Sequence, residues 1–419
     1  SRAAGTWRGA RSRLAAGVLV AAAALGLARA LASPDWHEDA RAMARHQAQT
    51  LGPADTVVAM SYAPRYDLAT YHDRFGLAAR TLTLPEDAGA DDVRPRLPRR
   101  GRAALAIRYG SPADRRGMLP CLLGERAVGP PERTTTAGLA ELRFTLDASL
   151  PADVPRAPWP PGDSAMRGAS ADPAATPGGV AFGDHRAPAG RLVAVDAARR
   201  WPADRALCVH AAFVVEAPMA GDLKLAVTAV DARGDEAARA DAVLATADQR
   251  GSAAVPPGTA LEAFALLWLP VGQAPGPLSL WVRVYDPAAA PDGLEPRPAA
   301  ADVGATSARA LRTLTVEATA GTWGVDAPPA IDLPRRLDLA TPGGARLVAT
   351  DAPTEAADAG ALSNGGAAGV TLLWRGAGAL PLLTVADTAG RWRVDLPPPP
   401  PWAAPVRRDR RSFRVPVDA

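Results

Sequence analysis

Three tyrosines are the first side chains in this sequence that could contact a ligand. Tyr62 ends a short apolar run, residues 56–62, which predicts a buried strand, and Tyr66 and Tyr71 follow shortly after it. In α/β units, ligands bind at the loops that follow the carboxyl ends of strands, so these rings are candidate ligand contacts. The alternative is that the rings pack against the sheet and only their polar tips face water.

Two tryptophans form a second set of candidates. An exposed indole can stack on the apolar face of a sugar, and Trp201 and Trp323 both lie near predicted loops. Trp268, Trp281 and Trp374 fall inside strand patterns, so we expect these three in the core. The speculative ligand contacts are therefore Trp201 and Trp323, together with the three tyrosines.

Two acidic clusters could bind a metal, but neither has the spacing of a known ligand motif. Residues 35–39 (DWHED) open a predicted helix, where acidic side chains are favoured by the helix dipole, and His46 follows them. The acids at 231, 235, 236 and 241 crowd a predicted β-turn and lack a calcium-loop pattern. Nucleotide, hydrolase and metalloprotease motifs are also missing from the sequence. We therefore assign no catalytic, cofactor-binding or metal-binding residue and expect no cofactor.

Composition narrows the class of protein. Hydrophobic residues make up 48% of the chain, enough for real cores, and 42 Pro with 38 Gly favour many turns and short strands. Lys224 is the one lysine among 47 basic residues, and the net charge is only +3. Because no arginine stripe with interleaved aromatics is present, nucleic-acid binding is excluded. Cys121 and Cys208 fall in different predicted domains, and we expect both to be buried small apolar side chains.

The stretch Leu14–Ala32 follows a basic flank and is rich in Ala, Leu and Val. Such a pattern indicates either a membrane-spanning helix or a signal peptide cleaved before Ser33. In both cases residues 33–419 lie outside the cytoplasm, and in the first case residues 14–32 contact membrane lipid. Since the chain starts with Ser rather than Met, we expect this stretch to be the last helix of a larger membrane domain.

Helical and strand patterns alternate between residues 35 and 150. Helices are predicted at residues 36–51, 66–75 and 113–123, and strands at 56–62, 80–84, 102–109 and 139–146. Alternation of this kind predicts a small α/β, Rossmann-like domain with a largely parallel sheet.

Residues 151–179 form a Pro/Gly/Ala linker, after which the pattern becomes all-β. Strands are predicted at 191–197, 206–216, 223–230, 261–269, 278–285 and 309–317. The heptapeptide RLVAVDA of residues 191–197 recurs as RLVATDA at 346–352, and three further matches follow in the same order. We therefore predict one complete β-sandwich at 180–325 and a second, truncated copy at 326–419. The predicted fold class is multidomain: a transmembrane helix within residues 1–34, the α/β domain of 35–150, and these sandwiches.

Residues 35–146 resemble the extracytoplasmic tail of bacterial multi-pass glycosyltransferases of the GT-C class, which are similar to dolichyl-phosphate-mannose–protein mannosyltransferases. The resemblance is carried by the Trp-containing helix at Trp36, the strand of residues 56–62 after a Gly-Pro turn, and the Tyr-rich segment 66–75. An FGD sequence at Phe182–Asp184 and a YDP run ending at Pro287 are similar to the start and end of β-sandwich modules in such proteins. The catalytic carboxylates of the family lie on a loop between early membrane helices, and nothing in this sequence matches that region.

The resemblance implies a non-catalytic, extracytoplasmic tail of a bacterial cell-membrane glycosyltransferase that uses a polyprenyl-phosphate sugar donor. Its modules would orient the acceptor or bind a polyprenyl-linked sugar or an envelope glycan. The alternative is an exported or membrane-anchored cell-envelope protein whose β-sandwiches bind a partner and which has no enzymatic activity.

Overall fold

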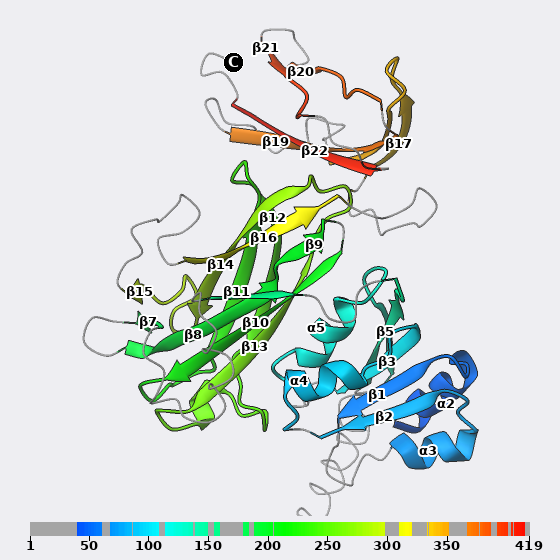
Figure 1. Ribbon diagram of the computed structural model, residues 1–419, viewed down its shortest axis with the longest axis vertical. Helices are drawn as coiled ribbons and strands as arrows, with labels where there is room; N and C mark the ends of the chain where they lie inside the picture. The colour runs from blue at the N-terminus through cyan, green and yellow to red at the C-terminus, as the bar shows by residue number, and fades with distance from the viewer. Residues whose placement is uncertain are drawn as a thin grey trace, which may run out of the picture. The chain divides into compact units, whose positions relative to one another are not determined.

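Figure 1 shows the computed structural model of the 419-residue chain. It divides into two compact units. The first comprises Ser1–Leu84, Arg102–Ala113 and Glu132–Arg143, and the second comprises Pro85–Gly101, Asp114–Pro131 and Phe144–Ala419. The structure describes residues 40–60, 68–85, 87–108, 114–136, 139–149, 155–159, 179–183, 188–203, 205–297, 310–320, 333, 335–351, 367–376, 378–386, 392–400, 404 and 406–414.

The first unit is built on a mixed sheet of strand order β2-β1-β3-β5-β4. Strand β1 (Thr56–Met60) pairs in parallel with β2 (Arg80–Leu84) and with β3 (Gly101–Arg108). Strands β4 (Glu132–Thr136) and β5 (Leu139–Leu146) form an antiparallel hairpin. The predicted strands at 80–84 and 139–146 are confirmed residue for residue, whereas β4 was not predicted. The hairpin makes the sheet mixed rather than largely parallel.

Two helices accompany this sheet, α2 (Ala40–Thr50) and α3 (Leu68–Phe75). The buried residues of α2 are Ala40, Met43, Ala44 and Gln47, and this i, i+3, i+4, i+7 spacing places them on one helical face. Ala40 and Met43 form a small cluster with Leu139 of β5. The same periodicity buries a polar residue, Gln47, and so brings an amide into the interior.

The second unit contains two facing β-sheets with a common core. One sheet has the order β13-β10-β8-β7-β15, with β6 also paired to β8, and the other has the order β12-β11-β14-β16-β9. Alternate residues of β13 point into the core, including Leu261, Ala263, Ala265 and Leu267. The strands of the two sheets are β6 (Arg156–Trp159), β7 (Val180–Gly183), β8 (Pro188–Ala198), β9 (Arg200–Pro202), β10 (Ala206–Val215), β11 (Lys224–Val230), β12 (Glu236–Val243), β13 (Ala260–Trp268), β14 (Gly276–Tyr285), β15 (Pro296–Arg297) and β16 (Leu311–Thr319).

Among the described residues, four short helical elements also belong to the second unit: α4 (Ala90–Val93), the 3-10 turn η2 (Arg94–Arg96), α5 (Met118–Gly124) and the 3-10 turn η4 (Ser252–Ala254). The segment that leads into α5 lies against β13, where the Phe264 N–H donates to the Arg116 carbonyl at 2.8 Å. Gly117, the N-cap of α5, has a φ of +77°, and a Cβ there would lie 2.8 Å from the Phe264 oxygen. The sequence had placed α4, η2 and α5 in the α/β domain of residues 35–150.

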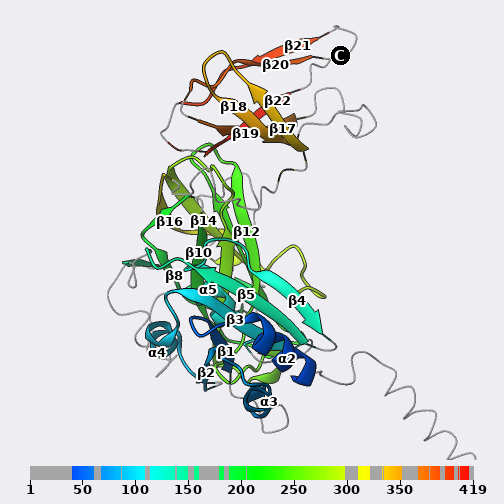
Figure 2. The same ribbon diagram turned by 90° about the vertical axis from the view of Figure 1, so that its right-hand side faces the viewer.

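The C-terminal part of the second unit forms a four-stranded sheet of order β17-β18-β19-β22, with a separate β20-β21 hairpin (Figure 2). Leu383 of β20 packs against a small core that contains Trp374. The repeated strand β18 pairs with β19, which pairs with β22, just as β8 pairs with β10 and β10 with β13. These strands are β17 (Arg335–Ala340), β18 (Arg346–Thr350), β19 (Ala367–Arg375), β20 (Leu383–Ala386), β21 (Arg393–Leu396) and β22 (Val406–Arg414).

The predicted fold class is wrong. The structure is mostly β-sheet, with 51% strand and 13% helical residues arranged in several sheets, rather than a membrane helix followed by an α/β domain and sandwiches. In the part of the chain that the structure describes, no helix has the length and apolarity needed to span a bilayer. The stretch 14–32, on which the membrane helix was predicted, lies outside the described residues. Helical periodicity was overweighted because short helices that pack on sheets carry the same amphipathic pattern as those of an α/β domain.

Candidate functional site

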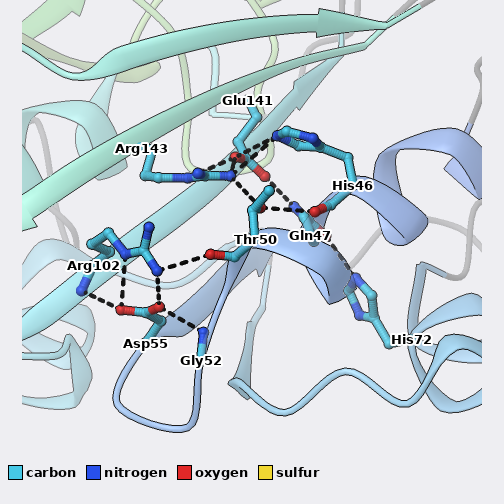
Figure 3. Close-up of polar contacts among 9 residues, drawn as sticks. All are labelled: His46, Gln47, Thr50, Gly52, Asp55, His72, Arg102, Glu141 and Arg143. Carbon is cyan, nitrogen blue, oxygen red and sulfur yellow. Dashed lines mark hydrogen bonds and ion pairs between the residues drawn. The ribbon is translucent and has the colours of Figure 1, made fainter.

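A buried polar network surrounds Glu141 in the first unit (Figure 3). Gln47 of α2 donates from Nε2 to one carboxylate oxygen of Glu141 at 2.7 Å. Arg143 lies two residues further along β5, on the same face of the strand, and donates from Nη2 to the other oxygen at 2.6 Å. The Glu141 side chain is only 1% exposed. Its buried charge is thus paired with a cation, and both of its oxygens accept hydrogen bonds.

The end of α2 extends this network toward solvent. Arg143 Nη2 also lies 2.8 Å from Thr50 Oγ1 and 3.2 Å from His46 Nε2, and Thr50 Oγ1 donates to the His46 carbonyl at 2.7 Å. A guanidinium can only donate, so His46 Nε2 acts as the acceptor. His46 is 31% exposed and lies 4.0 Å from Glu141. Its lone pair is therefore occupied by Arg143 rather than directed at a substrate position.

His72 of α3 joins the network through Gln47 (Figure 3). Its Nε2 lies 2.7 Å from Gln47 Oε1. Because the Gln47 amide nitrogen donates to Glu141, the amide oxygen accepts, and His72 Nε2 is the donor. Gln47 of α2 therefore connects His72 of α3 with Glu141 of β5.

A second ion pair fixes the loop that follows α2. Arg102 of β3 donates from Nη2 to Asp55 Oδ2 at 2.7 Å and to the Thr50 carbonyl at 2.8 Å. The Gly52 N–H also donates to Asp55 Oδ2, at 2.8 Å. Burial alone would raise the pKa of Asp55, but the hydrogen bonds from Arg102 and Gly52 outweigh it and hold that pKa below its ordinary value. Asp55 therefore stays ionised and anchors the start of β1 to β3.

These two networks position secondary structure. Each buried carboxylate accepts hydrogen bonds from an arginine, so its oxygens are engaged in structural contacts. The Nε2 atom of His46 is likewise engaged by Arg143. What the arrangement does is lock α2, α3, β3 and β5 together.

A chain of alternating charges lies in the second unit, on the face of the β13-β10-β8 sheet that carries Phe264. Phe264 is stacked on His210 with 4.3 Å between ring centroids, and the His210 Nε2 lies 3.4 Å from Glu262. The fully buried Arg116 also donates to Glu262. Burial would raise the pKa of Glu262, but His210 and then Arg116 lower it to about 2. On β8, Asp196 accepts from Arg156 at 2.6 Å.

The two cysteines are joined, which the sequence analysis did not expect. Cys121 of α5 and Cys208 of β10 form a disulfide with 5.2 Å between their Cα atoms, and both residues are fully buried. Their burial was predicted correctly, but their pairing was missed because they were assigned to different domains. The available signal was that these are the chain's two cysteines and that its predicted location is oxidising.

The predicted ligand contacts occupy different environments. Tyr71 is half-buried beside the α2 cluster, with its ring 6.5 Å from that of Phe75. Trp201 is 3% exposed, and its indole N–H donates to the Ala206 carbonyl at 2.9 Å. Tyr62, Tyr66 and Trp323 lie outside the described residues.

The acidic cluster at residues 231, 235, 236 and 241, which the structure describes, shows no metal geometry. Within the described ranges, no group of three or more His, Cys, Asp or Glu side chains is placed to hold a metal ion. Residues 35–39 lie outside those ranges. Asp231 is used by its own turn, since its Oδ1 accepts the N–H of Arg233 at 2.9 Å and that of Asp235 at 3.0 Å.

Comparison with known proteins finds no protein family whose model matches this chain and no curated protein similar to it.

Proposed function

We propose that this chain is a non-catalytic, extracytoplasmic region of a bacterial membrane glycosyltransferase that uses a polyprenyl-phosphate sugar donor. The glycosyltransferase part rests on the resemblance of residues 35–146, and the observation that carries the extracytoplasmic part is the disulfide between Cys121 and Cys208. Structural disulfides persist in oxidising compartments outside the cytoplasm and are rare inside it. A buried disulfide that fastens α5 to β10 therefore supports an extracytoplasmic location for the second unit.

The charged networks support the non-catalytic part of the proposal. In the first unit, Glu141 pairs with Arg143 of the same strand, and Asp55 pairs with Arg102 of β3. His46 accepts a hydrogen bond from Arg143. A general acid or base needs a pKa near the working pH and a free proton site. The lowered pKa of Asp55 is that of a structural anion.

The alternative function is an exported or membrane-anchored envelope protein that binds a partner through its β-sheets and has no enzyme attached. One observation favours it: the second unit contains a polar cavity lined in part by the half-buried Trp268. Both proposed functions require an extracytoplasmic location. They differ in whether the chain is part of a glycosyltransferase.

The location can be tested by thiol trapping in the native host. Cells are quenched in acid, denatured and treated with a mass-adding maleimide, with and without prior reduction. Peptide mapping should find no adduct on Cys121 or Cys208 without reduction and one on each after it, with Cys121→Ser as the control that leaves Cys208 free. Two adducts in unreduced cells would refute an extracytoplasmic location.

A second experiment separates the two functions. Membranes from cells with and without this region are assayed for sugar transfer from a polyprenyl-phosphate donor, and the reading frame upstream of Ser1 is inspected. Further apolar spans upstream and a loss of transfer support the glycosyltransferase. An initiating Met within a few codons, with transfer unchanged, supports the envelope binding protein.

A further inference from the structure

A polar cavity of about 140 Å³ lies in the second unit. Its walls are the turn between β11 and β12, the end of β13 with the residues that follow it, and strand β22. The residues that line it include Asp231, Asp235, Trp268, Gln273, Arg408 and Arg410. The cavity is smaller than the roughly 300–1,000 Å³ of pockets for drug-sized ligands, so it suits one small ring rather than an extended chain.

The indole of Trp268 reaches the cavity because of strand register. Along β13, Ala265 and Leu267 point into the shared core, so Trp268, the next residue, points to the other face of the sheet. It is half-buried there. Because Trp268 lines the cavity and is only partly buried, its indole can offer a flat apolar surface next to polar groups.

The acidic wall of the cavity is held by its own backbone. Asp231 Oδ1 accepts the N–H groups of Arg233 and Asp235, which fixes the turn before β12 begins. This turn presents the Asp235 carboxylate to the cavity. These backbone contacts therefore hold the turn that carries Asp235 in place without a ligand.

The opposite wall of the cavity is strand β22, which approaches the residues after β13 closely at Gly272. The Arg408 N–H donates to the Gly272 carbonyl, and Gly272 has a φ of +75°. A Cβ on Gly272 would lie 2.6 Å from the Arg408 nitrogen, so this approach requires glycine. Arg410, on the same strand, donates to the Glu236 carbonyl at 3.4 Å and lies 4.0 Å from Asp235 Oδ1.

The separation between Arg410 and Asp235 indicates the kind of ligand group. At 4.0 Å the guanidinium and the carboxylate are too far apart for a direct hydrogen bond. A hydroxyl placed between them would accept from Arg410 and donate to Asp235 at the same time. A simple anion could satisfy only the arginine, and a simple cation only the carboxylate.

Overall charge and shape favour a neutral sugar. Three acidic and three arginine side chains line the cavity, so their formal charges cancel. Gln273 adds an amide that can both donate and accept. We propose that this cavity binds the terminal ring of a neutral saccharide, with Trp268 against the apolar face of the ring and the Asp235–Arg410 pair on a hydroxyl. The proposal rests on the extracytoplasmic location proposed above, where a glycan chain would meet the cavity.

The test is a calorimetric titration of the full chain with glucose, mannose, galactose and N-acetylglucosamine. Glucuronate and glucosamine serve as anionic and cationic comparators. We expect at least one neutral sugar to bind with a Kd on the order of millimolar and more tightly than either charged sugar. Binding of no neutral sugar, or tighter binding of a charged one, would overturn the proposal.

Matched variants locate the site. Asp235→Asn and Arg410→Gln should each weaken binding about tenfold or more, because each removes a charge-assisted hydrogen bond to the hydroxyl. Asp241→Asn and Arg239→Gln alter an ion pair on β12 outside the cavity and should change Kd less than about twofold. Equal losses of sugar affinity in the cavity variants and in the β12 variants would refute the assignment of the site to this cavity. Circular dichroism of all four variants checks that they fold.

Failure of this proposal and failure of the proposed function give different results. If Cys121 and Cys208 are oxidised in cells but no neutral sugar binds, the saccharide site is wrong and the location stands. If both thiols are free in cells, the proposed function is wrong whatever the titration shows.

Discussion

Reduction of the disulfide between Cys121 and Cys208 should cost the second unit about 4 to 5 kcal/mol of unfolding free energy. The two residues are 87 positions apart in the sequence. In the chain-entropy treatment, a cross-link that closes a loop of that length removes enough freedom from the unfolded chain to give roughly 4.6 kcal/mol at 25 °C. Both residues are fully buried in the native state.

The assay is urea unfolding of the oxidised chain and of the same chain reduced under denaturing conditions and refolded with reductant. Far-ultraviolet circular dichroism and tryptophan fluorescence follow the transition, and the free energy is extrapolated to water. We also expect a larger m-value for the reduced chain, because its unfolded state is less compact.

The reasoning can be refuted in two ways. Mass spectrometry of the purified chain could show two free thiols, in which case the pairing is wrong. Alternatively, the oxidised and reduced chains could differ by less than about 1 kcal/mol, in which case the cross-link does not restrict the unfolded ensemble as calculated. The double variant Cys121→Ala, Cys208→Ala is the control, since it should be insensitive to reductant.

Three further predictions concern single residues. Glu141→Gln should destabilise the first unit by about 3 kcal/mol in urea, because it leaves the buried Arg143 without a counter-ion, whereas the exposed Glu132→Gln should change little. The pKa of Glu262 is lowered from 4.5 to about 2, so its carboxylate contributes stability above about pH 4.5 that is lost as the pH falls toward 2. Glu262→Gln should flatten that acid dependence of the urea midpoint, and an unchanged slope would contradict the assignment. Gly117→Ala should lower the melting temperature, because the φ of Gly117 is positive and a Cβ there would lie 2.8 Å from a backbone oxygen of β13. An unaltered melting temperature would show that the backbone at this position is free to move.

Local elements could be predicted well from the sequence. The strand at 139–146 and the strand at 80–84 were found residue for residue, and the helix of residues 36–51 contains α2. Each of these patterns repeats every two residues or about every 3.6, so a short window of sequence contains the whole signal. The Thr-rich strand β4 gave no alternation of apolar and polar residues and was missed.

The environments of the tryptophans were harder to predict. Trp201 was expected near an exposed loop and is buried on β9, while Trp268 was expected in the core and lines a cavity. Both lie in strand segments, and which face of a strand is covered depends on its register and on what packs against it. The residues next to Trp201 or Trp268 in the sequence show neither the strand register nor the packing partner.

By itself the sequence determined several local elements, among them α2, β2 and β5, and that the two cysteines are buried, because apolar periodicity and turn residues act over a few positions. Only the tertiary structure decided which partners meet. Gln47 reaches Glu141, Asp55 reaches Arg102, and Cys121 reaches Cys208, with 94, 47 and 87 positions between the members of each pair. Closing loops of that length costs chain entropy, and only the packing of whole sheets offsets it. Such contacts therefore arise from the complete fold and leave no signature in any short stretch of sequence.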